Sequence, residues 1–258
     1  MIKRLIISPI LLVLSLIAYY YSRSDILLWS TASTLFFWSF VALIIPSSFY
    51  KYIKNGIMRY KKKRSLWISL ALYMSYHVIL YSFFFYLLLP GSIRSLSFSF
   101  SVNAGIGYSV PPPLPYFLQW VSDSPAIWFF IGPYEGDVIP FSTFMGVILA
   151  ILIGLNVAQI SELWGISSKV NKSIVMIPSL GVISGSSCCV FLPSIVMYSI
   201  ALSITSITAT ILSILSSFTY FVIVYYVLPI ISAIVLFHNL TLLDKLVIKI
   251  SREHIKRV

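Results

Sequence analysis

The chain contains only two cysteines, and they are neighbours, Cys188 and Cys189. Adjacent thiols cannot join distant parts of a fold, and side chains at successive helical positions diverge by about 100°. We therefore expect two free thiols rather than a disulfide. Thiolates favour soft metal cations, so the pair is a candidate site for a thiophilic metal. The alternative is that both residues only fill space between packed helices.

The residues around the two cysteines are small or break the helical hydrogen bonding. Gly181 and Gly185 form a small-xxx-small face that another helix can approach closely. Pro193 frees a backbone carbonyl that Ser or Thr side chains and neighbouring helices satisfy. We predict that these three residues mediate helix packing.

This segment resembles the first helix of the bacterial mercuric-ion transport proteins, in which small residues lead into a Ser-x-Cys-Cys sequence followed by proline. Residues 186–189 match that sequence, and Pro193 stands one residue further away than in the family. The resemblance covers about a dozen residues, and the second cysteine pair of that family is absent. It implies that Cys188 and Cys189 receive a thiophilic metal ion within the membrane.

A second resemblance is one of spacing. ABC importer permeases have a cytoplasmic loop that reads Glu-Ala-Ala, then a glycine, then a proline thirteen residues after the glycine. Gly165 and Pro178 have this spacing, whereas residues 159–161 read Gln-Ile-Ser. The resemblance implies an ABC-type permease subunit that lacks the residues with which the family docks its ATPase.

Other reactive residues are sparse. The predicted membrane spans carry no Asp, Glu, Lys or Arg at depth, which disfavours an ion-coupled carrier. Only His77 lies near the centre of a span, which disfavours a bis-histidine cytochrome. The chain has no HExxH, CxxC or Walker sequence. We therefore predict no enzymatic activity and no cofactor.

The elements that position these residues are predicted to be membrane helices. The 258 residues are 59% hydrophobic and 10% charged, with a mean hydropathy of +0.96, which excludes an ordinary soluble enzyme. A bilayer crossing takes about 20 apolar residues. We predict an all-α membrane protein, a single polytopic domain over 1–258, with six transmembrane helices. The predicted spans are 5–21, 26–50, 66–89, 138–159, 174–202 and 208–237.

Basic residues set the predicted topology. The uncharged run 174–237 fits two long helices or three short ones. With two helices, 16 of the 18 Lys and Arg residues face the cytoplasm, and only Arg23 and Arg94 lie outside. We therefore predict a multi-pass protein of the cell membrane with both termini in the cytoplasm.

The same topology accounts for the net charge of +11 without nucleic acid as a partner. Lys and Arg beside membrane spans attract anionic lipid headgroups. The cytoplasmic tail 239–258 has the pattern of an amphipathic helix lying in the interface, with Leu243, Leu246, Val247 and Ile250 on its apolar face. The residues predicted to contact lipid headgroups are Lys61, Lys62, Lys63, Arg64, Lys245 and Lys249.

One long extracytoplasmic loop, residues 91–137, is too short and too apolar for an independent domain. Serines alternate with apolar residues over 95–102, which predicts a strand with one apolar face. Prolines at 111–113 and 115 then predict a stiff extended stretch. The loop either packs on its own helices and the lipid or forms a docking surface for a partner subunit.

These observations predict a non-catalytic integral subunit of a larger membrane complex. Its partners are membrane lipids and other integral membrane subunits, which dock through loop 91–137. The alternative is a transporter or channel for a thiophilic metal ion that uses Cys188 and Cys189. The near absence of glutamine, only Gln119 and Gln159, also favours a thermophilic archaeon as the source.

Overall fold

The structure is a computed structural model. It describes residues 2–88, 98–104, 111–131, 134–166, 197, 200–201 and 203–255. These residues are mainly helical, which confirms that part of the predicted class. They also include a three-stranded sheet, so the all-α description is incomplete. The chain divides into two compact units, one formed by residues 1–52 and 85–144 and the other by residues 53–84 and 145–258.

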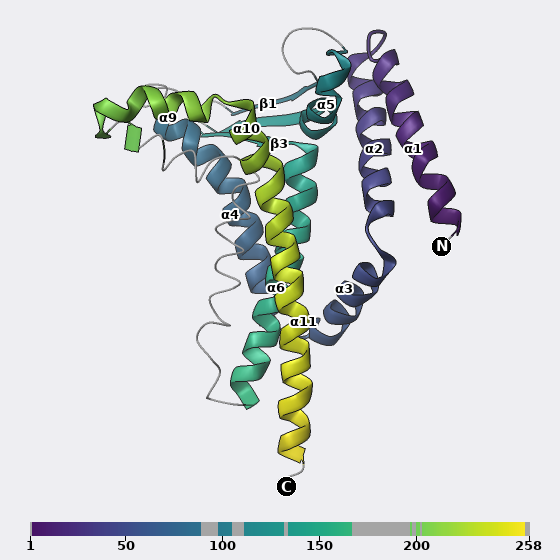
Figure 1. The fold of residues 1–258 in the computed structure, drawn as a ribbon, viewed down its shortest axis with the longest axis vertical. Coiled ribbons are helices and arrows are strands. Elements are labelled where there is room, and N and C mark those ends of the chain that lie inside the picture. Colours follow the sequence, from purple (N-terminus) through teal and green to yellow (C-terminus); the bar gives the residue numbers. More distant parts are fainter. Residues whose placement is uncertain are drawn as a thin grey trace. The chain divides into compact units, whose positions relative to one another are not determined.

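The first unit is built on a helical hairpin. α1 (Ile2–Tyr21) and α2 (Ile26–Ile44) lie side by side, as Figure 1 shows. The side chain of Asp25 begins α2 by accepting a hydrogen bond from the backbone N–H of Leu28 at 3.1 Å. Two buried serines join the helices, because each hydroxyl donates to the other's backbone carbonyl. Ser15 donates to Ser33 at 2.7 Å, and Ser33 donates to Ser15 at 2.9 Å.

A proline separates the second helix from the basic segment that follows. α2 ends at Ile44, and Pro46 disfavours helical geometry in the residue before it. The next helix, α3, runs over Ser47–Tyr60. The predicted span 26–50 therefore divides into two helices, and the second of them carries the basic residues Lys51, Lys54 and Arg59.

The outer loop folds against the hairpin of the first unit. Its elements are β1 (Phe98–Asn103), η1 (Leu114–Tyr116), α5 (Phe117–Asp123), β2 (Ala126–Ile131) and β3 (Tyr134–Val138). The strands form an antiparallel sheet in the order β1-β2-β3, and Phe100 pairs with Phe129. The strand predicted over 95–102 is confirmed for its described residues.

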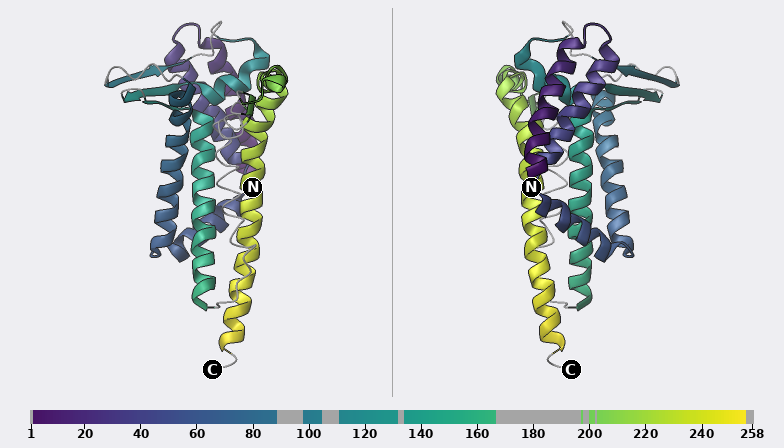
Figure 2. Two further views of the ribbon diagram at one scale, coloured as in Figure 1. Left: turned by 90° about the vertical axis from the view of Figure 1, so that its left-hand side faces the viewer. Right: turned by 90° about the vertical axis from the view of Figure 1, so that its right-hand side faces the viewer.

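The second unit surrounds one buried helix. The most apolar stretch of α6 (Pro140–Ile166) is two-thirds buried. Figure 2 shows this helix beside α4 (Arg64–Leu88) and α11 (Leu228–Ile255). Glycines permit close approach on two sides. A Cβ at Gly154 would lie 3.2 Å from the backbone oxygen of Leu66, and one at Gly56 would lie 3.2 Å from Leu155 Cδ1.

Three of the described helical segments are long and apolar enough to cross a membrane: Ile26–Ile44, Pro140–Trp164 and Phe218–Val247. A shorter apolar helix covers Ile6–Tyr21. The predicted fifth span, 174–202, lies almost entirely outside the described residues. The membrane character of the chain is therefore supported by the length and composition of these helices.

The last predicted span differs in position from the long apolar segment in the structure. α9 (Thr208–Leu215) ends before Ser216, and Ser217 then begins α10 (Phe218–Phe221) by accepting from Tyr220 N. A π-helical stretch, η4 (Val222–Val227), leads into α11. A wide turn is suited to this place, because Pro229 has no N–H to bond the preceding turn. The apolar segment is therefore 218–247 instead of 208–237.

The C-terminal tail continues this last helix. Leu243 and Val247 are buried against Ile160 and Leu163 of α6. Leu243 and Val247 therefore face protein, which corrects the predicted interfacial helix of residues 239–258 at these two positions, whereas Leu246 is exposed. The amphipathic pattern records helix packing at Leu243 and Val247.

The serine pair of the first unit can be tested directly. A combined S15A/S33A change removes both interhelical hydrogen bonds, which in membrane proteins contribute about 0.6 kcal/mol each and reach about 1.7 kcal/mol at most. We expect thermal unfolding in detergent to begin a few degrees lower. The control is S39A, because Ser39 is exposed on the same helix. Equal melting of the two variants would contradict a structural role for the pair.

Candidate functional site

The predicted metal and packing site is not placed by the structure. Cys188, Cys189, Gly181, Gly185 and Pro193 all lie outside the described residues. Among the residues that are described, no group of three or more His, Cys, Asp or Glu side chains could hold a metal ion. The candidate sites in the described part of the chain are therefore formed by other residues.

The residues predicted to contact lipid headgroups lie near the ends of three helices. Lys61, Lys62 and Arg64 are exposed between α3 and α4, and Lys245 is exposed on α11. Lys63 is half-buried, and its ammonium lies 5.3 Å from the ring centre of Tyr60, a cation–π distance. Lys249 lies on the same helix as Lys245. The exposed members are free to meet anionic headgroups, while Lys63 also serves the fold.

In the first unit, side chains of the hairpin hold the backbone of the outer loop. The hydroxyl of Tyr19 donates to the carbonyl of Pro112, and the hydroxyl of Thr34 donates to the carbonyl of Ser124. The indole N–H of Trp38 donates to the carbonyl of Val121 at 2.8 Å. The proline stretch has few N–H groups to form a regular ladder, and Val121 and Ser124 lie at the end of α5, where carbonyls lack a partner within the helix. The three donors therefore satisfy these carbonyls and fix the loop to the hairpin.

Aromatic packing reinforces this attachment. Trp120 of α5 is 0% exposed and packs with Val121 against Tyr19. The ring of Tyr19 meets Phe117 edge-on at 5.3 Å and Trp120 at 6.3 Å. Phe37 of α2 also meets Phe117 edge-on, at 5.8 Å. Such pairs favour one orientation of α5 on the hairpin, so the loop is a fixed part of the unit.

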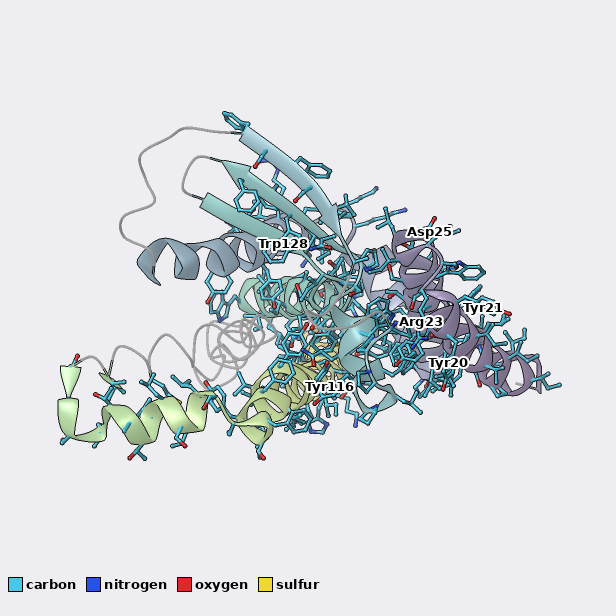
Figure 3. All side chains as sticks on the ribbon, turned by 90° about the horizontal axis from the view of Figure 1, so that it is seen from above. Tyr20, Tyr21, Arg23, Asp25, Tyr116 and Trp128 are labelled. Atoms are coloured by element: carbon cyan, nitrogen blue, oxygen red, sulfur yellow. The ribbon has the colours of Figure 1, made fainter. Side chains whose placement is uncertain are left out.

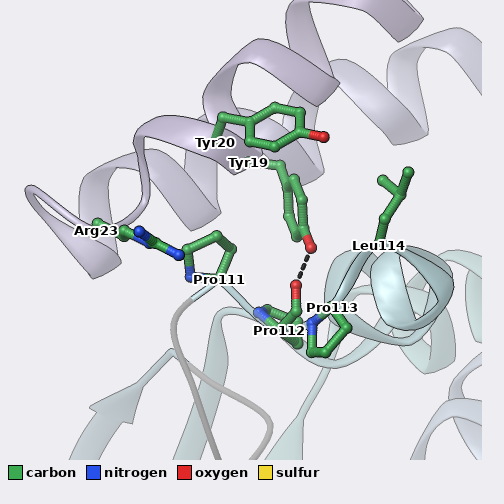
Figure 4. A pocket seen from close by; sticks show the side chains of 7 residues that line it. All are labelled: Tyr19, Tyr20, Arg23, Pro111, Pro112, Pro113 and Leu114. Atoms are coloured by element: carbon green, nitrogen blue, oxygen red, sulfur yellow. Dashed lines mark hydrogen bonds between the residues drawn. The ribbon is translucent and has the colours of Figure 1, made fainter.

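A cavity of about 550 Å³ opens beside this attachment. Figure 4 shows it between the end of α1 and the proline stretch, with Arg23 reaching toward Pro111 and Tyr19 bonded to Pro112. Its lining residues are Tyr19, Tyr20, Arg23, Pro111, Pro112, Pro113 and Leu114. Arginine is the one cationic side chain in this lining, and the prolines supply no N–H donors.

The sheet of the first unit leaves apolar side chains uncovered. Phe98 is 79% and Phe100 is 70% exposed, on the edge strand β1. Val102, Ile127 and Val138 lie on the same face by register and are also exposed. An edge strand with exposed aromatic residues is a surface that soluble proteins avoid.

In the second unit, one arginine joins two helices through their carboxylates. Arg59 of α3 lies 2.9 Å from Asp244 of α11 and 3.3 Å from Glu162 of α6, measured between guanidinium nitrogens and carboxylate oxygens. The hydroxyl of Tyr60 donates to Glu162 at 2.6 Å. Three helices therefore meet in one network, which we call the Arg59 junction and define as Arg59, Tyr60, Glu162 and Asp244.

Burial and charge alter the acid–base properties of this junction. Burial raises the pKa of the Tyr60 hydroxyl above its ordinary value, and the hydrogen bond to Glu162 raises it further. Burial lowers the pKa of Arg59, but the charges of Tyr60, Glu162 and Asp244 raise it by more. Tyr60 and Arg59 therefore keep their protons at neutral pH, as their hydrogen bond and ion pairs across three helices require.

Three carboxamides lie deeper between α6 and α11. Asn156 donates to the carbonyl of Leu236 at 3.1 Å and accepts from Asn239 at 2.7 Å. Gln159, one turn along α6, is 4% exposed, and its side-chain oxygen is buried without a hydrogen-bond donor among the described residues. Amides satisfied across two apolar helices fix their register.

No protein family, characterised protein or solved structure matches the chain. Its function is therefore inferred from the geometry of the two units.

Several of these residues were not predicted from the sequence. Gly56 is a packing glycine that stands alone in the sequence. The other packing glycine, Gly154, belongs to a run of small residues at intervals of four, Gly146, Ala150, Gly154 and Ala158, so a small-xxx-small signal was present there. Arg59 was grouped with the basic stretch, and its partners are more than a hundred residues away. The donor to the carbonyl of Pro112 could not be predicted, because a backbone acceptor carries no sequence signal.

The Arg59 junction predicts a modest loss of stability on substitution. In R59Q both carboxylates lose their cation, but the arginine side chain is 40% exposed, so solvent screening limits the expected loss to about 1 kcal/mol or less. We expect a lower melting temperature in detergent, with a larger effect at low salt. K54Q is the matched control, because Lys54 is exposed on the same helix. A salt-independent difference would contradict the ionic role.

The Tyr60 hydroxyl predicts a dependence on alkaline pH. Because folding raises its pKa, its stabilisation is complete below the unfolded pKa of about 10 and is lost as pH rises through the higher folded value. Y60F should therefore melt below the natural protein at pH 8, and the gap should narrow above about pH 10. Y21F, at an exposed tyrosine, serves as the control. The role of the Tyr60 hydroxyl would be contradicted if the difference in melting temperature between Y60F and the natural protein stayed constant up to pH 11.5, roughly one to two units above the ordinary tyrosine pKa.

Proposed function

We propose that the chain is a non-catalytic integral subunit of a larger membrane complex. The observation that carries this proposal is the exposed apolar face of the outer sheet, with Phe98 and Phe100 on a free edge strand. Isolated proteins cover or charge such edges because they recruit other chains. A permanent partner subunit covers this face in the assembled complex.

The attachment of the outer loop supports this role. Tyr19, Thr34 and Trp38 hold the loop backbone from the hairpin, and Trp120 anchors α5. A docking surface that is already ordered loses little conformational freedom when a partner binds. The hairpin and loop together thus present the sheet as a preformed interface.

The proposed setting is the cell membrane, which the chain crosses six times with both termini in the cytoplasm. Three apolar helical segments of sufficient length support a membrane location, and the distribution of Lys and Arg supports the orientation. On this topology the Arg59 junction lies on the cytoplasmic side, and the sheet lies outside. Lipids and neighbouring subunits are then the partners.

The docking surface predicts a loss of partners on substitution. F98S/F100S changes two exposed side chains, so the chain should still fold and enter the membrane. We expect its native-gel band, after extraction from its own membranes in mild detergent, to lose proteins that mass spectrometry finds at stoichiometric amounts in the natural band. S99A/S101A, on the opposite face of the same strand, is the control.

Two results would contradict the proposal. One is a natural protein that migrates alone, with no stoichiometric partner. The other is a partner-free band that carries thiol-bound copper, silver or mercury, which would favour a metal transporter that uses Cys188 and Cys189. Metal analysis of the same band separates these outcomes, and a C188S/C189S variant identifies the ligands.

A further inference from the structure

One face of α1 carries an uninterrupted row of exposed apolar side chains. Ile6, Ile10, Val13, Ile17 and Tyr20 are all exposed, and they recur at intervals of four and three residues. This spacing places them on one side of a helix. At a rise of 1.5 Å per residue the row is about 21 Å long, which exceeds the roughly 15 Å of hydrocarbon in one leaflet.

This row of apolar side chains ends near the positively charged side chain of Arg23, which lines the cavity. Arg23 follows Tyr20 by three residues and is exposed in the turn of the hairpin, and Figure 3 shows both residues there with Asp25. The Asp25 carboxylate caps the start of α2, where it accepts a hydrogen bond from the backbone N–H of Leu28. Among the described residues, Arg23 makes no ion pair within 4 Å. Its guanidinium is therefore available to an anion in the cavity.

The residues that line the cavity restrict which kind of anionic ligand can bind there. Pro111, Pro112 and Pro113 offer no N–H groups, and the Tyr19 hydroxyl already donates to Pro112. The side-chain donors left in the lining are the guanidinium of Arg23 and the hydroxyl of Tyr20. Guanidinium binds phosphate in a bidentate manner. The remaining walls are apolar, so a ligand with one anionic group and an apolar body fits better than a small hydrated ion.

We propose that this cavity and the row on α1 bind one membrane phospholipid. Its phosphate pairs with Arg23 and its acyl chain lies along Ile17, Val13 and Ile10. The length of the row and the position of the cation at its end carry the assignment. The site does not involve the sheet face that a partner subunit is proposed to cover, so it stands or falls independently of the proposed function.

Photo-crosslinking in liposomes tests the site. The purified full-length chain is reconstituted with a trace of phosphatidylglycerol that carries a diazirine on its acyl chain, and peptic peptides are mapped by mass spectrometry. We expect crosslinks at Val13 and Ile17. In R23Q they should fall at least about tenfold, the change that corresponds to losing one charge-assisted contact. R23K should retain part of the yield, because the charge remains.

R4Q is the matched control, because Arg4 lies at the other end of α1 and its guanidinium faces the ring of Tyr50 at 5.9 Å. It should leave the crosslinks at Val13 and Ile17 unchanged. Three results would overturn the proposal. These are equal labelling by a diacylglycerol probe without phosphate, equal labelling of the natural protein and R23Q, and displacement of the phospholipid probe by millimolar glycerol phosphate, which would indicate a soluble anion.

Discussion

The first unit depends on side-chain donors for backbone carbonyls that have no partner in a helix or a sheet. A proline-rich loop beside apolar helices has carbonyls that neither a strand partner nor water reliably satisfies. Tyr19, Thr34 and Trp38 supply the missing donors from the hairpin. The same solution joins the helices themselves, where Ser15 and Ser33 bond each other's backbone. Hydroxyl and indole donors on apolar helices thus hold this unit together.

The second unit also has to join apolar helices, and the type of residue that joins them changes along α6. Gly56 and Gly154 bring neighbouring helices close to it, and the pair Asn156 and Asn239 fixes the register of α11. Beyond these residues, Arg59 joins α3 to α6 and α11 where charge is tolerated. The order from small residues to amides to ions follows the increasing cost of burying each group away from water.

These two constraints leave particular surfaces uncovered, and the uncovered surfaces carry the functional proposals. The hairpin fixes the outer sheet so that Phe98 and Phe100 stay exposed on an edge strand. It also fixes the proline stretch so that a cavity remains beside Arg23. Neither surface has the nucleophiles or metal ligands of a reaction centre. Both suit association, one with protein and the other with lipid.

Composition and hydrophobic patterning by themselves determined the mainly helical, apolar character of the protein, the starts of the helices near Ile2, Ile26 and Pro140, and the strand that includes Phe98, because these depend on local sequence alone. The end of α2 was also written in the sequence, at Pro46. Tertiary structure alone decided which donors reach the loop carbonyls, that Leu243 packs on α6, and that Arg59 meets Glu162 and Asp244. Each of these contacts joins residues far apart in the chain, and amino-acid type alone does not specify which distant partner a side chain meets.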